Sequence, residues 1–202
     1  MAIISLIKLG ESHYYSLIRA AIESWPREVM GEIYGKRHSD TLRITNVYEF
    51  VTAKRLPTSV SYGNDEAIKR LRRLDEVIRR NKYLKSKLVG GFHTHVIGRS
   101  NRDLLRKEQN SLSKDDLNFI KDEMNIAGLN EWIEILVRIE RKTYSTIKRP
   151  SKTLTYSSKK MKIKIRDFPH QGYDITFSAF HIDKNLKVKE IKIRNGEMLK
   201  SA

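Results

Sequence analysis

The chain has 202 residues, of which 39% are hydrophobic and 32% charged, and it contains no cysteine. This composition is typical of a folded globular protein, and it excludes a disordered chain, a disulfide framework and a thiolate metal site. Forty Lys and Arg against 24 Asp and Glu give a formal net charge of +16, which favours anionic partners such as nucleic acid or acidic protein surfaces. The length fits a single domain over residues 1–202.

The N-terminal part predicts a strand, a helix and a hairpin. Residues 1–10 are too few to span a bilayer and lack a cleavage site, so we expect an opening strand and a cytoplasmic protein. Apolar residues from Tyr14 to Ile22 recur at helical spacing, which predicts a helix that ends near Trp25. Residues 29–34 and 42–51 are rich in β-formers and predict a hairpin.

A second helix is expected at residues 64–82, after a loop at residues 54–63. Asn64 is its candidate N-cap, and a stripe of apolar residues that includes Val77 predicts its buried side. The opposite side is strongly basic. Its simplest interpretation is a solvated surface, and the alternative is a binding surface for an acidic protein or nucleic acid.

The second half alternates strands with one helix. We expect a helix opened by Ser113 and ended by Gly128, and basic irregular segments at residues 96–112 and 148–160. The expected strands are residues 88–95, 132–139, 162–165, 173–182 and 186–193. Helices interspersed with strands predict an α/β domain whose mixed β-sheet is flanked by helices, with the basic, β-rich residues 150–202 packed on the same domain.

The run GGFHTH at residues 90–95 is the strongest chemical signal. Side chains alternate across a strand, so His93 and His95 point to the same face. Two imidazoles on one face supply half of a tetrahedral zinc site, and a catalytic site needs a third protein ligand and an open position. SxxD at Ser113–Asp116 offers that ligand, although the same pattern is a helix capping box.

The ordered set EVMG at Glu28, GGFHTH and SLSKDDL resembles the JAMM motif of MPN-domain metalloproteases, over about residues 1–140. It is similar to the deubiquitinating subunit of the proteasome lid and the isopeptidase subunit of the COP9 signalosome. The resemblance implies the cytidine-deaminase-like MPN fold and one Zn²⁺ per chain bound by His93, His95 and Asp116. It also implies that Glu28 acts as general base and then acid, and that Ser113 hydrogen-bonds the oxyanion.

Two departures from the family pattern leave alternatives open. Val96 stands where the family has proline, and the 17 residues between His95 and Ser113 form a longer, basic segment beside the expected site. A second SxxD, at Ser100 and Asp103, lies closer to His95 but is followed by no comparable helical stripe. Glu32 is a fallback base because it shares a strand face with Glu28.

The function that the resemblance implies is zinc-dependent hydrolysis of peptide or isopeptide bonds at the C-terminus of ubiquitin or ubiquitin-like modifiers, whose conjugates would be the partners. Two alternatives remain. One is a catalytically inactive MPN scaffold that binds a partner, and the other is a nucleic-acid-associated protein. No membrane partner is expected.

Overall fold

The computed structural model describes residues 3–50, 54–55, 60–61, 70, 73, 77, 86–97, 111–143, 151–157, 159–167 and 171–195. The helices are α1 (Glu11–Ser24) and α4 (Lys114–Ala127). The strands are β1 (Leu6–Leu9), β2 (Met30–His38), β3 (Thr41–Glu49), β4 (Lys54–Arg55), β5 (Val60–Ser61), β6 (Lys87–Ile97), β7 (Glu131–Thr143), β8 (Ser151–Tyr156), β9 (Met161–Asp167), β10 (Gln171–Asp183) and β11 (Val188–Asn195).

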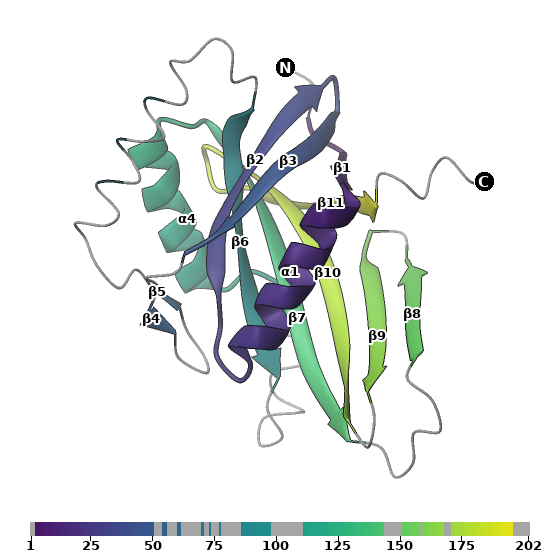
Figure 1. The fold of residues 1–202 in the computed structure, drawn as a ribbon. Helices are drawn as coiled ribbons and strands as arrows, with labels where there is room; N and C mark the ends of the chain where they lie inside the picture. Colours follow the sequence, from purple (N-terminus) through teal and green to yellow (C-terminus); the bar gives the residue numbers. More distant parts are fainter. Residues whose placement is uncertain are drawn as a thin grey trace.

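The main sheet closes on itself. Its strand order is β11-β1-β3-β2-β6-β7-β10-β9-β8, and β10 also pairs with β11, so the strands from β11 to β10 form a ring. β9 and β8 extend the sheet beyond that ring, and β4 pairs with β5 separately (Figure 1). β1 runs parallel to β11 and β3, and β6 runs parallel to β7, whereas the other pairings are antiparallel.

The expected α/β fold, with a sheet flanked by helices, is therefore wrong. The described part of the chain is dominated by strands, and two of them, β7 and β10, run for 13 residues each and pair along their whole length. Because strands twist, long paired strands curl, and here the curling lets the N-terminal β1 pair with β11, which follows β10 in a hairpin. Residues 151–156, expected as part of a basic loop, form the strand β8.

Other expectations agree with the structure in part. The β2–β3 hairpin forms where expected, although β2 continues to His38 and β3 ends at Glu49. The strand of the two histidines also forms, and it extends beyond the expected residues at both ends. The helix expected at residues 64–82 and the segment at residues 98–110 lie outside the described residues, apart from single positions. One of these, Val77, is 65% exposed, so its expected place on a buried stripe is wrong.

The ring has an inner and an outer face. Inner-face residues such as Phe92, Ile135 and Phe177 form the main hydrophobic core, and α1 covers this core with Tyr14 and Leu17. Figure 1 shows α1 crossing in front of β6, β7 and β10. Among the described residues, neither helix combines the length and apolar character needed to cross a bilayer.

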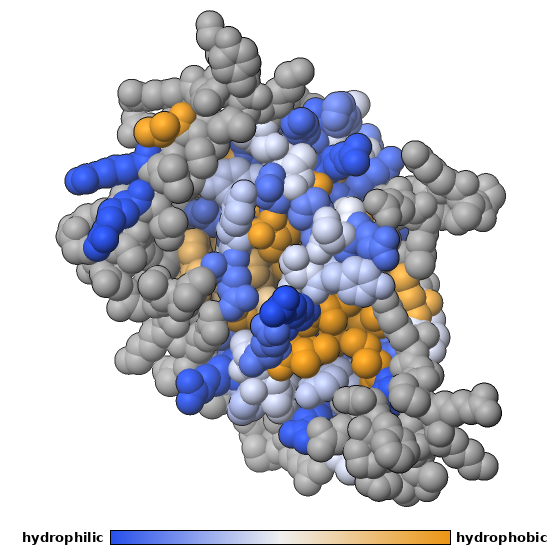
Figure 2. Space-filling model, in the orientation of Figure 1, coloured by the Kyte–Doolittle hydropathy of each residue, from blue (hydrophilic) through white to orange (hydrophobic). Residues whose placement is uncertain are grey.

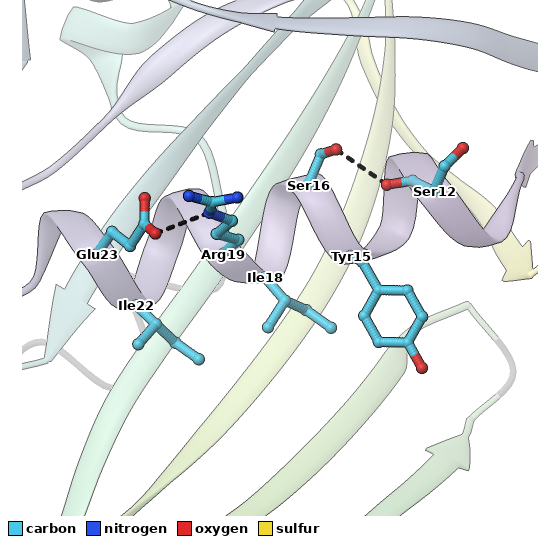
Figure 3. Close-up of a pocket in the computed structure, with 7 residues that line it drawn as sticks. All are labelled: Ser12, Tyr15, Ser16, Ile18, Arg19, Ile22 and Glu23. Carbon is cyan, nitrogen blue, oxygen red and sulfur yellow. Dashed lines mark hydrogen bonds and ion pairs between the residues drawn. The ribbon is translucent and has the colours of Figure 1, made fainter.

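The other side of α1 borders a groove of about 570 Å³. Figure 3 shows its lining along the helix, where Ser16 donates to the carbonyl of Ser12 at 2.9 Å and Arg19 pairs with Glu23 at 2.7 Å. The lining is Ser12, Tyr15, Ser16, Ile18, Arg19, Ile22 and Glu23. All these lining residues belong to α1, so the groove lies along that helix.

The outer face of β7 and β10 is covered by α4. Ile120 and Met124 of this helix pack with Trp132 and Leu136 of β7 in a second hydrophobic cluster. The helix ends at Gly128, whose φ of 64° is a left-handed conformation that favours glycine. This packing fixes the N-terminal end of α4 above β6, and that end carries the candidate site.

Candidate metal centre

The two histidines of the GGFHTH run lie on the outer face of β6. Phe92, between glycine and histidine, points inward into the core, so His93 and His95 point outward. In register, His93 lies opposite Met30 of β2 and Leu136 of β7. The histidines therefore occupy the part of the outer face that faces α4.

Asp116 reaches the histidines from the first turn of α4. Ser113 is the N-cap, and its Oγ accepts a hydrogen bond from the Asp116 backbone N–H at 3.1 Å. In return the Ser113 backbone N–H donates to Asp116 Oδ2 at 2.6 Å. This capping box fixes the Asp116 side chain, and the positive end of the helix dipole stabilises its negative charge.

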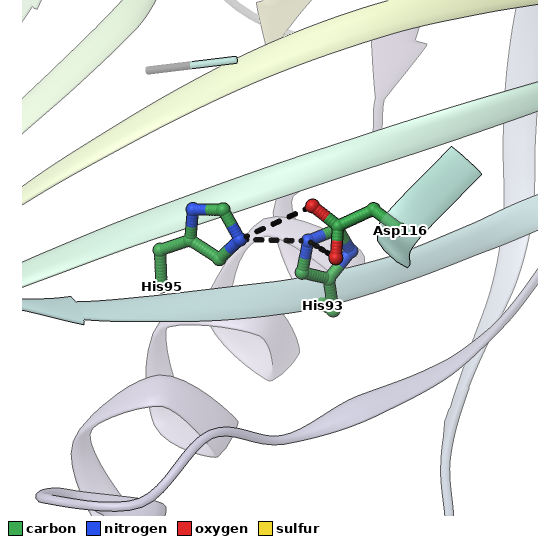
Figure 4. A group of neighbouring side chains, drawn as sticks. All are labelled: His93, His95 and Asp116. Atoms are coloured by element: carbon green, nitrogen blue, oxygen red, sulfur yellow. Dashed lines mark hydrogen bonds and ion pairs between the residues drawn. The ribbon is translucent and has the colours of Figure 1, made fainter. Parts of the chain in front are cut away.

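His93, His95 and Asp116 converge on one point (Figure 4). Their ligand atoms all lie within 4.8 Å of one another. The two Nε2 atoms are 3.1 Å apart, His93 Nε2 is 3.5 Å from Asp116 Oδ1, and His95 Nε2 is 3.6 Å from Oδ2. Tetrahedral zinc with bonds of about 2.0–2.1 Å separates its ligand atoms by about 3.3 Å. The nitrogen and oxygen ligands therefore suit a transition-metal ion in both type and spacing.

A second carboxylate orients His93 from behind. His93 Nδ1–H donates to Glu134 Oε1 at 2.7 Å, and the indole N–H of Trp132 donates to Glu134 Oε2, also at 2.7 Å. Because Nδ1 carries the proton, Nε2 is the nitrogen that remains for a metal. Gly91 leaves room for this arrangement, since a Cβ there would lie 3.1 Å from the Trp132 ring and 3.3 Å from Glu134 Oε2.

The preceding residue, Gly90, lies where the backbones of β6 and β7 approach closely. A Cβ on Gly90 would lie 1.8 Å from the carbonyl oxygen of Ile133, which no side chain permits. Gly90 therefore allows β6 and β7 to approach closely just before the histidines.

The carboxylates make the centre favourable for a cation. Burial lowers the pKa of His93, but hydrogen bonds to Asp116 and Glu134 outweigh burial and raise that pKa to about 10. Burial raises the pKa of Asp116, but hydrogen bonds to His93 and His95 outweigh it, and the pKa lies well below its usual range. A metal would compete with the proton for His93 Nε2.

Glu28 lies beside this group, just before β2. The Val29 N–H donates to the Thr94 hydroxyl at 2.8 Å, and the Thr94 N–H donates to the Val29 carbonyl at 2.8 Å. These bonds hold the Glu28 backbone next to the His93–His95 segment. Burial raises the pKa of Glu28 to about 7, with the charge of His93 lowering it and that of Asp116 raising it. Its carboxylate accepts a hydrogen bond from the Val96 N–H.

The sequence offered Glu32 as a second candidate base and Ser100 with Asp103 as a second candidate SxxD. Glu32 lies on the outer face of β2 opposite Gly91, where it accepts a hydrogen bond from the Tyr34 hydroxyl at 3.2 Å. Ser113 is exposed, and among the described residues its hydroxyl is engaged only by the helix cap. Ser100 and Asp103 lie outside the described residues.

Glu134 and Trp132 escaped the sequence prediction. The available signal is a glutamate, two residues after a tryptophan, inside the apolar run EWIEILV. On a strand these two side chains share a face, and a buried carboxylate requires partners. That signal predicts a buried network but does not say that its partner is His93.

No protein-family model and no curated protein matches the sequence. Among solved structures, the fold is similar to the solution structure of protein DSY2949 from Desulfitobacterium hafniense, a structural genomics target. The two share 15% sequence identity with a TM-score of 0.51, and the similarity covers 94% of this chain and 92% of the other. At this identity the similarity establishes the fold alone.

These comparisons correct the expected family. The sequence was expected to belong to the JAMM/MPN metalloproteases, but no family model supports that membership. The closed, strand-dominated sheet, which aligns with the D. hafniense protein over nearly the whole chain, is also not the α/β fold that the resemblance implied. Short motifs occur on unrelated folds by chance or convergence, so a motif identifies chemistry more reliably than ancestry. The structure thus presents a closed β-sheet protein with a His93–His95–Asp116 group able to hold a metal ion.

Proposed function

We propose that this protein is a zinc-dependent hydrolase of peptide or isopeptide bonds. One observation carries the proposal: two imidazoles and one carboxylate converge with spacings that suit zinc, and Glu28, a carboxyl with a pKa of about 7, lies beside them. Three protein ligands with an adjacent acid–base group are the arrangement of catalytic zinc sites, whereas structural sites usually use four ligands.

Each residue has a defined task in this proposal. Bound zinc supplies an acidified water and polarises a carbonyl oxygen. Glu28, whose carboxyl lies beside the three ligands, would take the proton of the attacking water and return it to the leaving amine. Ser113 has its hydroxyl at the start of α4, where it can donate to the oxyanion of the tetrahedral intermediate.

The burial of the centre favours an extended substrate. The side chains of His93, His95 and Asp116 keep only 10%, 12% and 21% of their exposure, so a folded surface cannot reach them. An extended chain can. We therefore propose as first substrates the C-terminal tails of ubiquitin-like proteins, joined to a lysine or to another chain.

The test combines metal analysis with cleavage of linked and fused ubiquitin-like substrates, each with and without a chelator. We expect one zinc per chain and release of a free tail only in the metal-replete sample. Glu28→Gln should keep zinc and lose cleavage, whereas His95→Ala should lose both. Glu32→Gln is the matched control, because it alters another buried carboxyl, which lies on β2 four residues after Glu28.

Two results would contradict the proposal. Substoichiometric zinc with no effect of the chelator would indicate a catalytically inactive binding module. Normal cleavage by Glu28→Gln would remove Glu28 from the mechanism and leave the metal site intact.

A further inference from the structure

Four cations lie side by side on the outer face of the ring. The one on the strand next to the histidines is Lys36 of β2, six residues along that strand from Met30, which lies opposite His93. Lys8 of β1 lies opposite Arg194 of β11 on one side and Arg43 of β3 on the other, and Arg43 lies opposite Lys36 of β2. We call Arg194, Lys8, Arg43 and Lys36 the cation row. Neighbouring strands are about 4.8 Å apart, so the row spans about 14 Å.

The alternation of each strand places the row on the outer face. Residues on either side of the cations, among them Ile7, Leu42 and Ile193, belong to the inner core. Arg43 is exposed, and the other three are half-buried. Figure 2 shows hydrophilic residues gathered over the end of the molecule where β2 and β3 meet.

Three of the four cations, Lys8, Lys36 and Arg43, have no ionic partner in the part of the chain that the structure describes. Arg194 is held by the carbonyl oxygens of Ile193 and Ser157, at 2.8 and 3.2 Å. The acidic residue of the adjacent turn, Asp40, accepts a hydrogen bond from the Ser5 hydroxyl at 2.5 Å.

Like charges directly opposite each other on neighbouring strands destabilise a sheet. At two other places on the outer face a cation has an acidic partner: Arg166 pairs with Asp174 at 3.0 Å, and Lys142 pairs with Glu140. A row that keeps its repulsion is explained if an anion with regularly spaced charges relieves it.

An exposed aromatic on the same face selects the kind of anion. Tyr48 of β3 lies opposite Glu32, so it also points outward, and it is 53% exposed. The Tyr34 ring supports it edge-on, with ring centroids 5.5 Å apart. A basic groove with an aromatic platform is the usual surface for single-stranded nucleic acid, in which phosphates bind the cations and a base stacks on the ring.

We propose that the cation row and Tyr48 bind single-stranded nucleic acid. The residues of this surface lie on β11, β1, β3 and β2, whereas the ligands of the metal centre lie on β6 and α4. The row binds the phosphate backbone and therefore carries no sequence preference, and Tyr48 stacks one base.

The test is fluorescence anisotropy with a labelled oligothymidylate over a range of salt concentrations. Lys36→Gln/Arg43→Gln should weaken binding at least tenfold and reduce the log–log salt slope by about 1.4, because each phosphate contact contributes about 0.7. Lys162→Gln/Lys164→Gln is the matched control: it removes the same charge from exposed positions of β9 and should leave the slope unchanged.

Two further variants separate the parts of the surface. Tyr48→Ala should weaken binding about tenfold with an unchanged salt slope, since stacking releases no counterions. His95→Ala should bind the oligonucleotide normally, which distinguishes this surface from the metal centre.

Four outcomes would overturn the proposal. Equal losses in the two double variants would indicate diffuse attraction by the net charge. Tighter binding of polyglutamate, lost in Lys36→Gln/Arg43→Gln, would identify an acidic protein as the partner. Equal affinity for a duplex with no effect of Tyr48→Ala would remove the single-strand assignment, and absence of binding at low salt would remove the surface altogether.

Discussion

The metal centre and the cation row occupy the same outer face but differ in how their charged groups are paired and exposed. At the centre, the charges of His93 and Asp116 are buried and each is engaged by hydrogen bonds. In the row, Lys8, Lys36 and Arg43 are half-buried or exposed and have no ionic partner in the described structure. One region is arranged to hold a cation, and the other leaves its cations available to an anion.

The difference follows from where α4 lies. The helix covers the outer face at β7 and β10, and its first turn reaches the histidines of β6, so charged groups beneath it lose water and must be paired. The cation row lies on β11, β1, β3 and β2, where water screens repulsion between neighbours. The buried charges of the metal centre therefore need hydrogen-bonding partners at defined positions. The exposed like charges of the cation row do not, because water screens their repulsion.

Replacing a metal-binding side chain should have the largest effect on the stability that zinc adds to the folded protein. With zinc at about a thousand times its dissociation constant, binding stabilises the folded state by about 4 kcal/mol. We expect zinc to raise the melting temperature of the natural chain and to leave Asp116→Ala unchanged. Asp115→Ala, an exposed neighbour in the same helical turn, is the control. A zinc response that survives in Asp116→Ala would show that the metal binds elsewhere.

Glu28 should give metal-free protein a pH-dependent loss of stability. Its folded pKa, about 7, lies above its unfolded value of 4.5. Below pH 4.5 both states hold the proton, and between 4.5 and 7 only the folded state holds it, so stability falls as pH rises through that window. The loss is complete above pH 7 and is on the order of 3 kcal/mol.

Glu28→Gln removes the titrating group, so this part of the decline should disappear in urea unfolding of the metal-free protein at several pH values. The same decline in natural and variant protein would mean that burial does not raise the pKa of this carboxyl.

Glu134→Gln should weaken zinc binding by about 10–100-fold, or about 1.4–2.7 kcal/mol. The amide replaces one of the two carboxylate oxygens by an NH2 donor, so it cannot accept from His93 at one position and from Trp132 at the other. Competition with a chromogenic chelator measures the change. Trp132→Phe, which keeps the carboxylate on His93, should lose less affinity. If both variants bind zinc like the natural chain, the Glu134 contact does not orient the ligand.

Local structure was largely predictable from the sequence, whereas closure of the sheet was not. Helical spacing located α1, and the SxxD pattern and Gly128 located both ends of α4. The ring depends on pairs distant in sequence, such as Leu6 with Lys192 and Ile135 with Ala179. No local pattern encodes such pairs, so alternating helices and strands suggested an α/β fold instead.

In the metal centre, too, local features were predictable from the sequence, and contacts between distant segments were not. The spacing of His93 and His95 on a strand determines that they share a face, and the capping box determines how Asp116 projects from α4. Their convergence with Glu28 was inferred only from the order of motifs. The network through Glu134 depends on β6 and β7 being neighbours, which the sequence does not reveal.

Removing a charge from the cation row should change stability least, and it should stabilise the protein, whereas most substitutions destabilise one. Arg43 lies between Lys8 and Lys36, so Arg43→Gln removes two like-charge contacts and should raise the free energy of unfolding by about 0.2–1 kcal/mol. Urea unfolding at low salt measures the gain, which should shrink as salt screens the charges. Arg141→Gln is the control, since this exposed arginine of β7 lies opposite Tyr173 and has no cation beside it in the register. Equal changes in the two variants would show that the row costs nothing, and an anion would then have no repulsion to relieve.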